Sequence, residues 1–86
     1  MSPPSVKFEV LLFASLRDRA GEPTISVEVS SPSTIASLRE ALSSTYPDLA
    51  PGLRASRVAV DNEFQEDSYV IAAGSEVAVI PPVSGG

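Results

Sequence analysis

The sequence predicts an α+β fold, a mixed sheet of four to five strands packed on one main helix and followed by an extended C-terminal tail. Short stretches with an apolar residue at every second position are typical of half-buried strands. One longer stretch repeats its apolar residues with the period of a helix, and two consecutive prolines follow the last apolar stretch. The 86 residues are enough for one domain, which we expect to span residues 1–80, with the tail at residues 81–86.

Residues 6–13 predict the first strand. Apolar and charged residues alternate at its start, and a continuous apolar run at its end indicates a central strand that enters the core. Residues 14–20 favour a helix of one or two turns, which ends at Gly21 because glycine readily adopts the left-handed conformation of a helix C-cap. Residues 24–29 alternate strictly, so we expect a second strand that pairs with the first as a hairpin.

The main helix is expected to begin after a cluster of serine, threonine and proline residues. Thr34 is a suitable N-cap because its hydroxyl can accept a hydrogen bond from the first helical turn. Five residues then fall on one helical face: Ile35, Leu38, Ala41, Leu42 and Tyr46. Pro47 ends this helix, since proline lacks the backbone donor that would continue it. We expect residues 48–55 to be a loop that Leu49 and Leu53 anchor to the core.

Two or three short strands are expected in the rest of the domain. Residues 58–60 predict a third strand, residues 61–63 a turn, residues 69–71 a short edge strand, and residues 76–80 a final strand after a turn at 72–75. With one substantial helix after the first hairpin, this order is the ubiquitin-like β-grasp layout. The first and last strands are central neighbours in that layout, so the tail would leave from the middle of the sheet.

The composition argues against several classes of function. The net charge is −5, with one lysine and five arginines, which argues against nucleic-acid binding. No apolar run approaches the ~20 residues of a membrane span, and the first ten residues show no secretory signal. The chain has no cysteine and no histidine, so it cannot form a disulfide, a thiolate site or a serine triad. We therefore expect a cytosolic protein that binds no membrane.

The acidic side chains do not predict a metal site. Glu63, Glu66 and Asp67 are close in sequence, but their spacing is not that of metal ligands, so we expect a solvated surface there and no bound metal. The chain also lacks a glycine-rich loop that could hold phosphates. Any nucleotide must therefore be bound by a partner protein.

The last six residues have the properties of an arm that is delivered to another protein: Pro81, Pro82, Val83, Ser84, Gly85 and Gly86. The two prolines remove backbone donors and favour an extended chain, so strand pairing should stop there. The two glycines have no side chain, which lets the backbone enter a narrow channel. Fully extended, the arm reaches on the order of 20 Å. The alternative is an unstructured chain end without function, which is common at termini.

The chemistry of the chain end follows from its carboxylate. A carboxylate is an anion at neutral pH and a poor electrophile, so it must be activated before a nucleophile attacks it. Adenylation by a nucleotide-using enzyme, followed by capture with sulfur or nitrogen, is the usual biological route. No side chain of this sequence can carry out that activation.

Several motifs together resemble a known family. These are the Phe-Ala-Ser-Leu-Arg-Asp segment at 13–18 followed by Gly21, the helix at 34–42 with Tyr-Pro at 46–47, and residues 74–86 with their Pro-Pro-Val-Ser-Gly-Gly ending. They resemble the small, sulfur-carrier subunits of molybdopterin synthases, which act in molybdenum cofactor biosynthesis. The resemblance covers nearly the whole chain from residue 6 onward, and the ending is its most specific part.

The resemblance implies a reaction at Gly86. A ubiquitin-activating-like adenylyltransferase and sulfurtransferase would consume ATP, adenylate Gly86 and convert it to a thiocarboxylate. The arm would then enter the large synthase subunit, in a heterotetramer of two small and two large subunits, and donate sulfur to cyclic pyranopterin monophosphate. The chain would be the sulfur-donating subunit of a sulfurtransferase complex, with the catalytic side chains on the large subunit. No stably bound cofactor is expected on this chain.

A carrier must be held by its partners, which predicts an apolar patch near the arm. Phe64 is one candidate for this patch because it lies alone in a polar stretch. The alternative is that the Phe64 side chain is buried under a loop at the edge of the core. Phe13, Arg17 and Ile80 match positions that the resembled family uses for docking. Their alternatives are a core position for Phe13 and Ile80, and a solvated helix face for Arg17.

Two other functions remain open from the sequence. One is a sulfur carrier that serves thiamine synthesis or tRNA thiolation. The other is a ubiquitin-like modifier, which would be joined to lysines of other proteins through an isopeptide bond. Both would use the same activated C-terminal glycine, so the three hypotheses differ in the acceptor.

Overall fold

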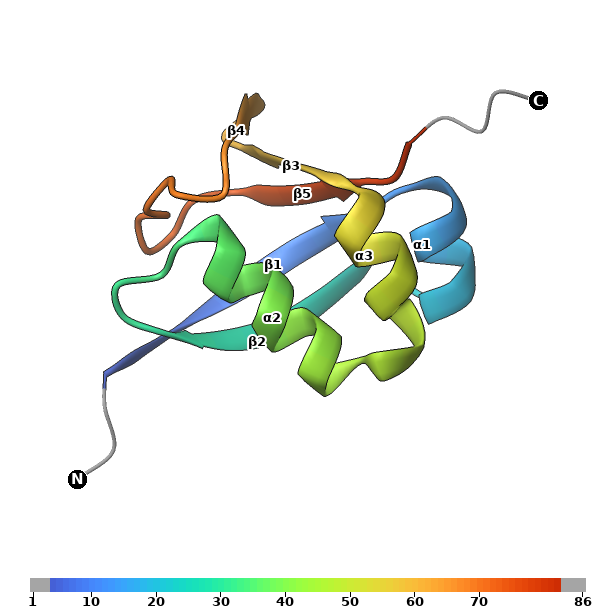
Figure 1. The fold of residues 1–86 in the computed structure, drawn as a ribbon, viewed down its shortest axis with the longest axis horizontal. Coiled ribbons are helices and arrows are strands. Elements are labelled where there is room, and N and C mark those ends of the chain that lie inside the picture. The colour runs from blue at the N-terminus through green and yellow to red at the C-terminus, as the bar shows by residue number, and fades with distance from the viewer. Residues whose placement is uncertain (1–3, 83–86) are drawn as a thin grey trace.

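The structure is a computed structural model that describes residues 4–82, and its sheet order is β2-β1-β5-β3-β4 (Figure 1). The strands are β1 (Ser5–Leu12), β2 (Thr24–Ser30), β3 (Arg57–Val60), β4 (Glu63–Gln65) and β5 (Val77–Ile80). The helices are α1 (Ala14–Ala20), α2 (Ile35–Thr45), the 3-10 helix η1 (Pro47–Leu49) and α3 (Ala50–Ala55). The predicted mixed five-stranded β-grasp is confirmed.

The core lies between one face of the sheet and the helices. Phe8, Val10 and Leu12 of β1 point to this face, because alternate residues of a strand point to the same side. They meet buried residues of α2, among them Leu38 and Leu42, which lie one turn apart on the helix. Figure 1 shows α2 crossing the sheet over β1 and β2. No helix of residues 4–82 covers the opposite face of the sheet.

The two predicted helix caps are confirmed. The backbone N–H of Ser37 donates to Thr34 Oγ1 at 3.1 Å, which satisfies a donor of the first turn of α2. Gly21 has φ 77°, and its N–H donates to the carbonyl of Arg17 at 2.9 Å, so it ends α1 in the left-handed conformation. The start of α2 and the end of α1 therefore lie where local sequence signals place them.

The predicted loop at residues 48–55 is wrong, because this segment forms η1 and α3. Pro47 and Pro51 lie at the starts of these two helices, where the missing N–H has no intrahelical partner to lose. Proline here ends one helix and begins the next. The anchoring role predicted for Leu49 and Leu53 is confirmed, since both side chains are buried.

The predicted edge strand at residues 69–71 is also wrong. The edge strand is β4 at Glu63–Gln65, whereas Val70 forms only an isolated bridge with Thr34. Asp61 and Asn62 have φ values of 50° and 71°, which makes them the two central residues of a tight hairpin turn. Because this turn takes only two residues, Glu63 already pairs with Val60.

β5 is the central strand of the sheet. It pairs in parallel with β1 and antiparallel with β3. The prediction that the first and last strands are adjacent in the sheet is therefore confirmed. After β5, Pro81 is buried and Pro82 is exposed. Val83, Ser84, Gly85 and Gly86 lie outside the described residues. Within residues 4–82, no helix has the length and apolar character to cross a membrane.

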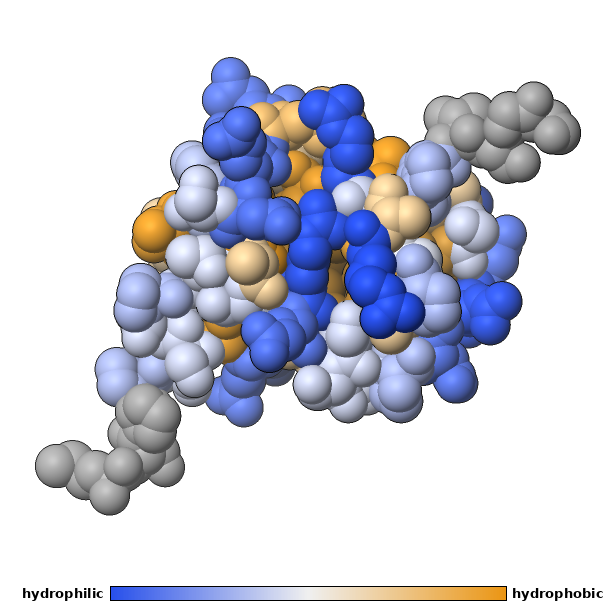
Figure 2. All heavy atoms as spheres, in the orientation of Figure 1, coloured by the Kyte–Doolittle hydropathy of each residue, from blue (hydrophilic) through white to orange (hydrophobic). Residues whose placement is uncertain are grey.

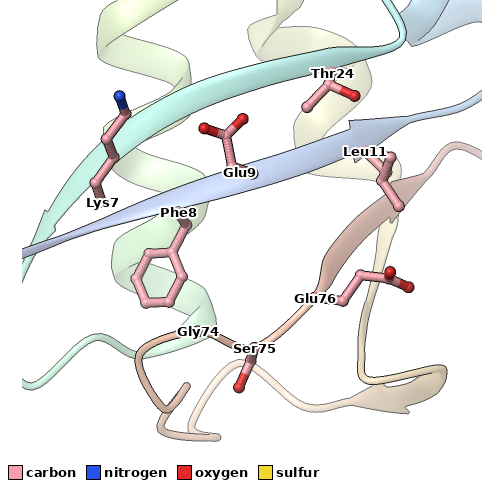
Figure 3. Close-up of a pocket in the computed structure, with 8 residues that line it drawn as sticks. All are labelled: Lys7, Phe8, Glu9, Leu11, Thr24, Gly74, Ser75 and Glu76. Atoms are coloured by element: carbon pink, nitrogen blue, oxygen red, sulfur yellow. The ribbon is translucent and has the colours of Figure 1, made fainter.

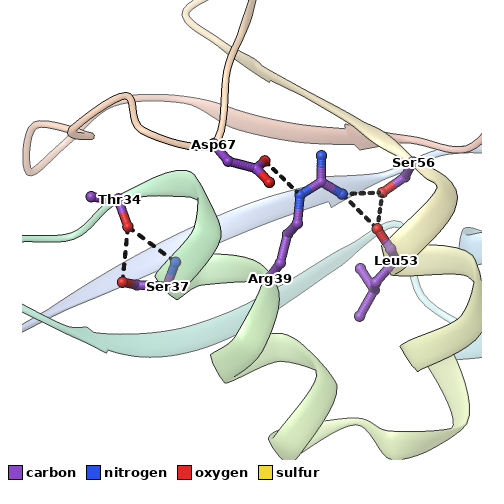
Figure 4. A network of polar contacts seen from close by, with 6 residues as sticks. All are labelled: Thr34, Ser37, Arg39, Leu53, Ser56 and Asp67. Carbon is purple, nitrogen blue, oxygen red and sulfur yellow. Dashed lines mark hydrogen bonds and ion pairs between the residues drawn. The ribbon is translucent and has the colours of Figure 1, made fainter.

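Arg39 of α2 connects three parts of the fold (Figure 4). Its Nε donates to Asp67 Oδ1 at 3.0 Å, and its Nη1 donates to the Leu53 carbonyl at 2.6 Å and to Ser56 Oγ at 3.3 Å. Ser56 Oγ also donates to the Leu53 carbonyl at 2.7 Å. One guanidinium thus ties the end of α3 and the segment after β4 to the main helix.

Arg39→Ala is expected to lower the free energy of unfolding by about 1–2 kcal/mol, because it removes a charged donor from a partly buried carbonyl. Asp67→Ala is the matched control. The Asp67 side chain is 62% exposed, so its loss should cost at most about 0.5 kcal/mol. Urea unfolding of the two variants checks this, and an equal loss in both would show that the ion pair, and not the carbonyl contact, dominates.

Candidate functional site

The face of the sheet opposite the helices carries an apolar row at the end where the arm leaves. The strand registers place residues of β1, β5, β3 and β4 side by side across the sheet: Leu11, Ala78, Ala59 and Phe64. Together with Phe13 and Ile80, they line a shallow hollow. We call these six residues the apolar face.

Three predicted docking residues belong to the apolar face. Phe13 and Phe64 are 42% and 48% exposed, and Ile80 is partly buried outside the main core cluster. The core alternatives considered for Phe13 and Phe64 are therefore wrong, whereas Ile80 is partly buried. The role of all three residues in docking stays a prediction.

Arg17 lies on α1, immediately after the apolar face. The carbonyl of Phe13 accepts from the N–H groups of Leu16 at 3.2 Å and Arg17 at 3.4 Å, so the first turn of α1 fixes the backbone beside the arm. The Arg17 side chain is exposed. Exposure fits both a docking residue and a solvated helix face, so the role of Arg17 also stays a prediction.

The sequence patterns do not single out Arg57, which the structure places at this site. Its guanidinium carbon lies 3.9 Å from the centroid of the Phe64 ring, a cation–π contact. Arg57 begins β3 directly opposite Ile80, the last residue of β5. Finding it requires the pairing of β3 with both β4 and β5, and β4 was not predicted.

The other half of the open face is polar (Figure 3). Lys7 and Glu9 of β1, Thr24 of β2 and Glu76 are among the residues that line a second shallow hollow. Glu9 Oε1 accepts a hydrogen bond from Ser26 Oγ at 3.2 Å. Because two carboxylates and one ammonium group line this hollow, it does not favour an anionic ligand such as a nucleotide phosphate.

Metal-ligand clusters and histidine or cysteine residues are two common kinds of catalytic group. Between residues 4 and 82, no three acidic, cysteine or histidine side chains gather closely enough to hold a metal ion. The full sequence has no histidine or cysteine that could act as a general base or thiol nucleophile. The apolar face therefore remains the candidate surface for contact with another protein.

Residues 10–86 match the model of the ThiS family. The chain is 34% identical over 82 residues to a molybdopterin synthase sulfur carrier subunit from Arabidopsis thaliana, covering 95% of this chain and 85% of the relative. The crystal structure of SAMP1 from Haloferax volcanii is 32% identical, with a TM-score of 0.78 over 93% of this chain and 99% of that chain. A ubiquitin from Caldiarchaeum subterraneum shares the fold, with a TM-score of 0.65 at 16% identity over 96% and 100% of the two chains.

The family match and the fold agree with each other. The family model covers all the strands from the middle of β1 onward together with the glycine ending. The resemblance to sulfur-carrier subunits that the sequence motifs indicate is confirmed by the relative at 34% identity. The chain therefore belongs to the ThiS family.

Proposed function

We propose that this chain is the sulfur-carrier small subunit of a molybdopterin synthase. The observation that carries the proposal is the apolar face at the root of an arm that ends in two glycines. The similarity to a sulfur carrier subunit over 95% of the chain supports it. The apolar face would bind first the activating enzyme and then the large subunit, while the arm carries the reacting group.

The proposed reaction begins with activation of Gly86. Its carboxylate attacks the α-phosphorus of ATP on an activating enzyme, pyrophosphate leaves, and an acyl-adenylate forms. A hydrosulfide-level sulfur donor then attacks the acyl carbon, and AMP leaves with the electrons of the broken C–O bond. The thiocarboxylate that remains is ionised at neutral pH, and its sulfur is a better nucleophile than the oxygen that it replaces.

Transfer follows in the large subunit. The thiocarboxylate sulfur attacks a carbon of cyclic pyranopterin monophosphate, and an oxygen substituent leaves that carbon with the electrons of the broken C–O bond. The arm and the pterin are then joined through a thioester. Water then attacks the acyl carbon, so the carboxylate is regenerated and the sulfur stays on the pterin. Two such transfers supply the two sulfurs of the dithiolene. Because the chain carries no acid or base in this scheme, the large subunit provides the catalytic side chains.

Incubation with the activating enzyme, ATP and sulfide is expected to raise the intact mass of the chain by the difference between one sulfur and one oxygen atom. Intact-mass spectrometry checks this, and omission of ATP is the control. The loaded chain should then convert cyclic pyranopterin monophosphate when the large subunit is added. An unchanged mass after confirmed adenylation would contradict the proposal.

A protein modifier is the second candidate function, because SAMP1, the small archaeal modifier protein 1 of Haloferax volcanii, is similar to this chain. The acyl-adenylate would then be attacked by a lysine amine of a target protein, with AMP leaving and an isopeptide bond forming. The last arginine or lysine of this chain is Arg57, so trypsin would leave residues 58–86 on the target. A protease that cleaves after glutamate leaves the shorter remnant 77–86. Lysines carrying that remnant in cell digests would favour the modifier.

A further inference from the structure

Arg57 stands at the junction of the apolar face and the arm. It begins β3, pairs with Ile80 across to β5, and is exposed. Ile80 is followed directly by Pro81, so Arg57 marks the strand position from which the chain leaves the sheet. On its other side, β4 places Phe64 under the guanidinium, with 3.9 Å between its central carbon and the ring centroid.

The guanidinium of Arg57 is held in place but has no anionic partner within the described residues. The ion pair found in residues 4–82 joins Arg39 to Asp67, and no hydrogen bond of the Arg57 side chain is formed there. An arginine has five N–H donors in a planar fork. Stacking on the Phe64 ring orients this fork without using the donors, so they stay available to another molecule.

The ends of the strands carry opposite charges on this side of the molecule. Because β3 runs antiparallel to β5, Arg57 lies at the arm end, and Arg54 lies just before it at the end of α3. The opposite ends of β3 and β5 adjoin Asp61 and Glu76, and Glu63 begins β4 at the same end of the sheet. A protein that accepts the arm and lies against the apolar face would therefore meet a positive charge next to the arm and negative charges farther away.

We propose that Arg57, oriented by Phe64, binds a carboxylate of the large subunit at the mouth of the channel that receives the arm. This inference rests on the proposed function and adds a specificity residue to it. A planar guanidinium binds a carboxylate through two parallel hydrogen bonds, which fixes an orientation as well as a position. The surrounding apolar residues exclude water from such a pair when the face is covered, and this strengthens it.

The test measures the dissociation constant of the complex between this chain and the large subunit from the same genome. Arg57→Ala is expected to weaken binding about 30-fold, the size typical of a buried arginine anchor. Arg57→Lys should also weaken binding, because an ammonium group keeps the charge but loses the fork. Arg54→Ala is the matched control, since Arg54 is exposed at the same end without an aromatic partner, and it should change binding less than about twofold.

A double-mutant cycle tests the orienting role of Phe64. In the Phe64→Leu background, which keeps an apolar side chain but removes the ring, Arg57→Ala should weaken binding much less than in the natural chain. Arg57→Ala should leave the urea unfolding midpoint nearly unchanged, because the side chain is exposed. If the Arg57→Ala chain binds the large subunit with the affinity of the natural chain, this inference is overturned, whereas the proposed function is not.

The outcomes separate this inference from the proposed function. If the natural chain fails to bind the large subunit, both are overturned. If Arg57→Ala weakens binding while the natural chain never acquires sulfur, the docking contact holds and the sulfur chemistry is wrong. If Arg57→Ala and Arg54→Ala weaken binding equally, the effect is general charge attraction and the specific contact is wrong.

Discussion

Deletion of Gly86 is expected to abolish sulfur transfer completely while the fold stays intact. Gly86 follows the last described strand in the sequence, and the buried core cluster of the described residues is formed by residues 8–79. The deleted chain ends at Gly85, which also carries a carboxylate. That carboxylate lies one residue, about 3.5 Å, short of the position the partner enzymes require. Misplacement of a reacting atom by far less than this lowers reaction rates strongly.

The loading of sulfur and its transfer in the large subunit should both fail because the arm is too short, and the two steps can be measured separately. Intact mass after treatment with activating enzyme, ATP and sulfide reports the loading of sulfur. A thiocarboxylate placed chemically on Gly85 bypasses loading and reports transfer in the large subunit alone. We expect neither loading nor transfer. A chain without Ser2 is the control, because it is shortened equally at the other end. Transfer at the natural rate from a Gly85 thiocarboxylate would contradict a fixed reach of the arm.

The parts of the fold that could be predicted from the sequence are those with a local physical cause. Gly21 ends α1 because glycine tolerates a positive φ, and Thr34 begins α2 because its hydroxyl accepts from the first turn. The antiparallel pairing of β1 and β2 follows from the alternation of apolar and polar residues, which is strict in β2 and holds at the start of β1. Each of these signals lies within a few residues of the feature that it specifies.

The parts that could not be predicted depend on contacts between distant segments. β4 has only three residues, two of them polar, and it is a strand because the two-residue turn before it aligns it with β3. The helical segment after Pro47 is stabilised by burial of Leu49 and Leu53, which local propensity does not report. A short polar strand and a helix that contains prolines both contradict the usual sequence signals.

Some features of the candidate site could also be predicted from the sequence, and others could not. The glycine ending and the prolines before it are local sequence signals, and they predict an extended arm from the sequence alone. The exposure of Phe64 depends on which face of β4 it occupies, so the sequence leaves core and surface equally open. The stacking of Arg57 on Phe64 requires two strands that are adjacent in space and separated by a tight turn. The proposal for the chemistry of the arm therefore comes from the sequence, whereas the proposal for recognition by the sheet requires the structure.

Phe8→Ala is expected to lower the free energy of unfolding by about 3–5 kcal/mol, the usual cost of removing a buried phenylalanine. Phe8 is 2% exposed, lies in the middle of β1, and pairs with Val27 of β2. A domain of this size has about 5–15 kcal/mol in total, so the variant should be unfolded at a much lower urea concentration. Its unfolding midpoint by circular dichroism measures the loss.

Lys7→Ala is the matched control, and it makes this experiment a test of the functional face as well. Lys7 precedes Phe8 on the same strand and points to the open face, so its loss should cost less than about 0.5 kcal/mol. Successive residues of a strand point to opposite faces, so the register that buries Phe8 also turns Leu11 outward into the apolar face. If both substitutions cost the same, the register of β1 is wrong. The apolar face beside the arm would then lose one of its central residues, and the docking proposal with it.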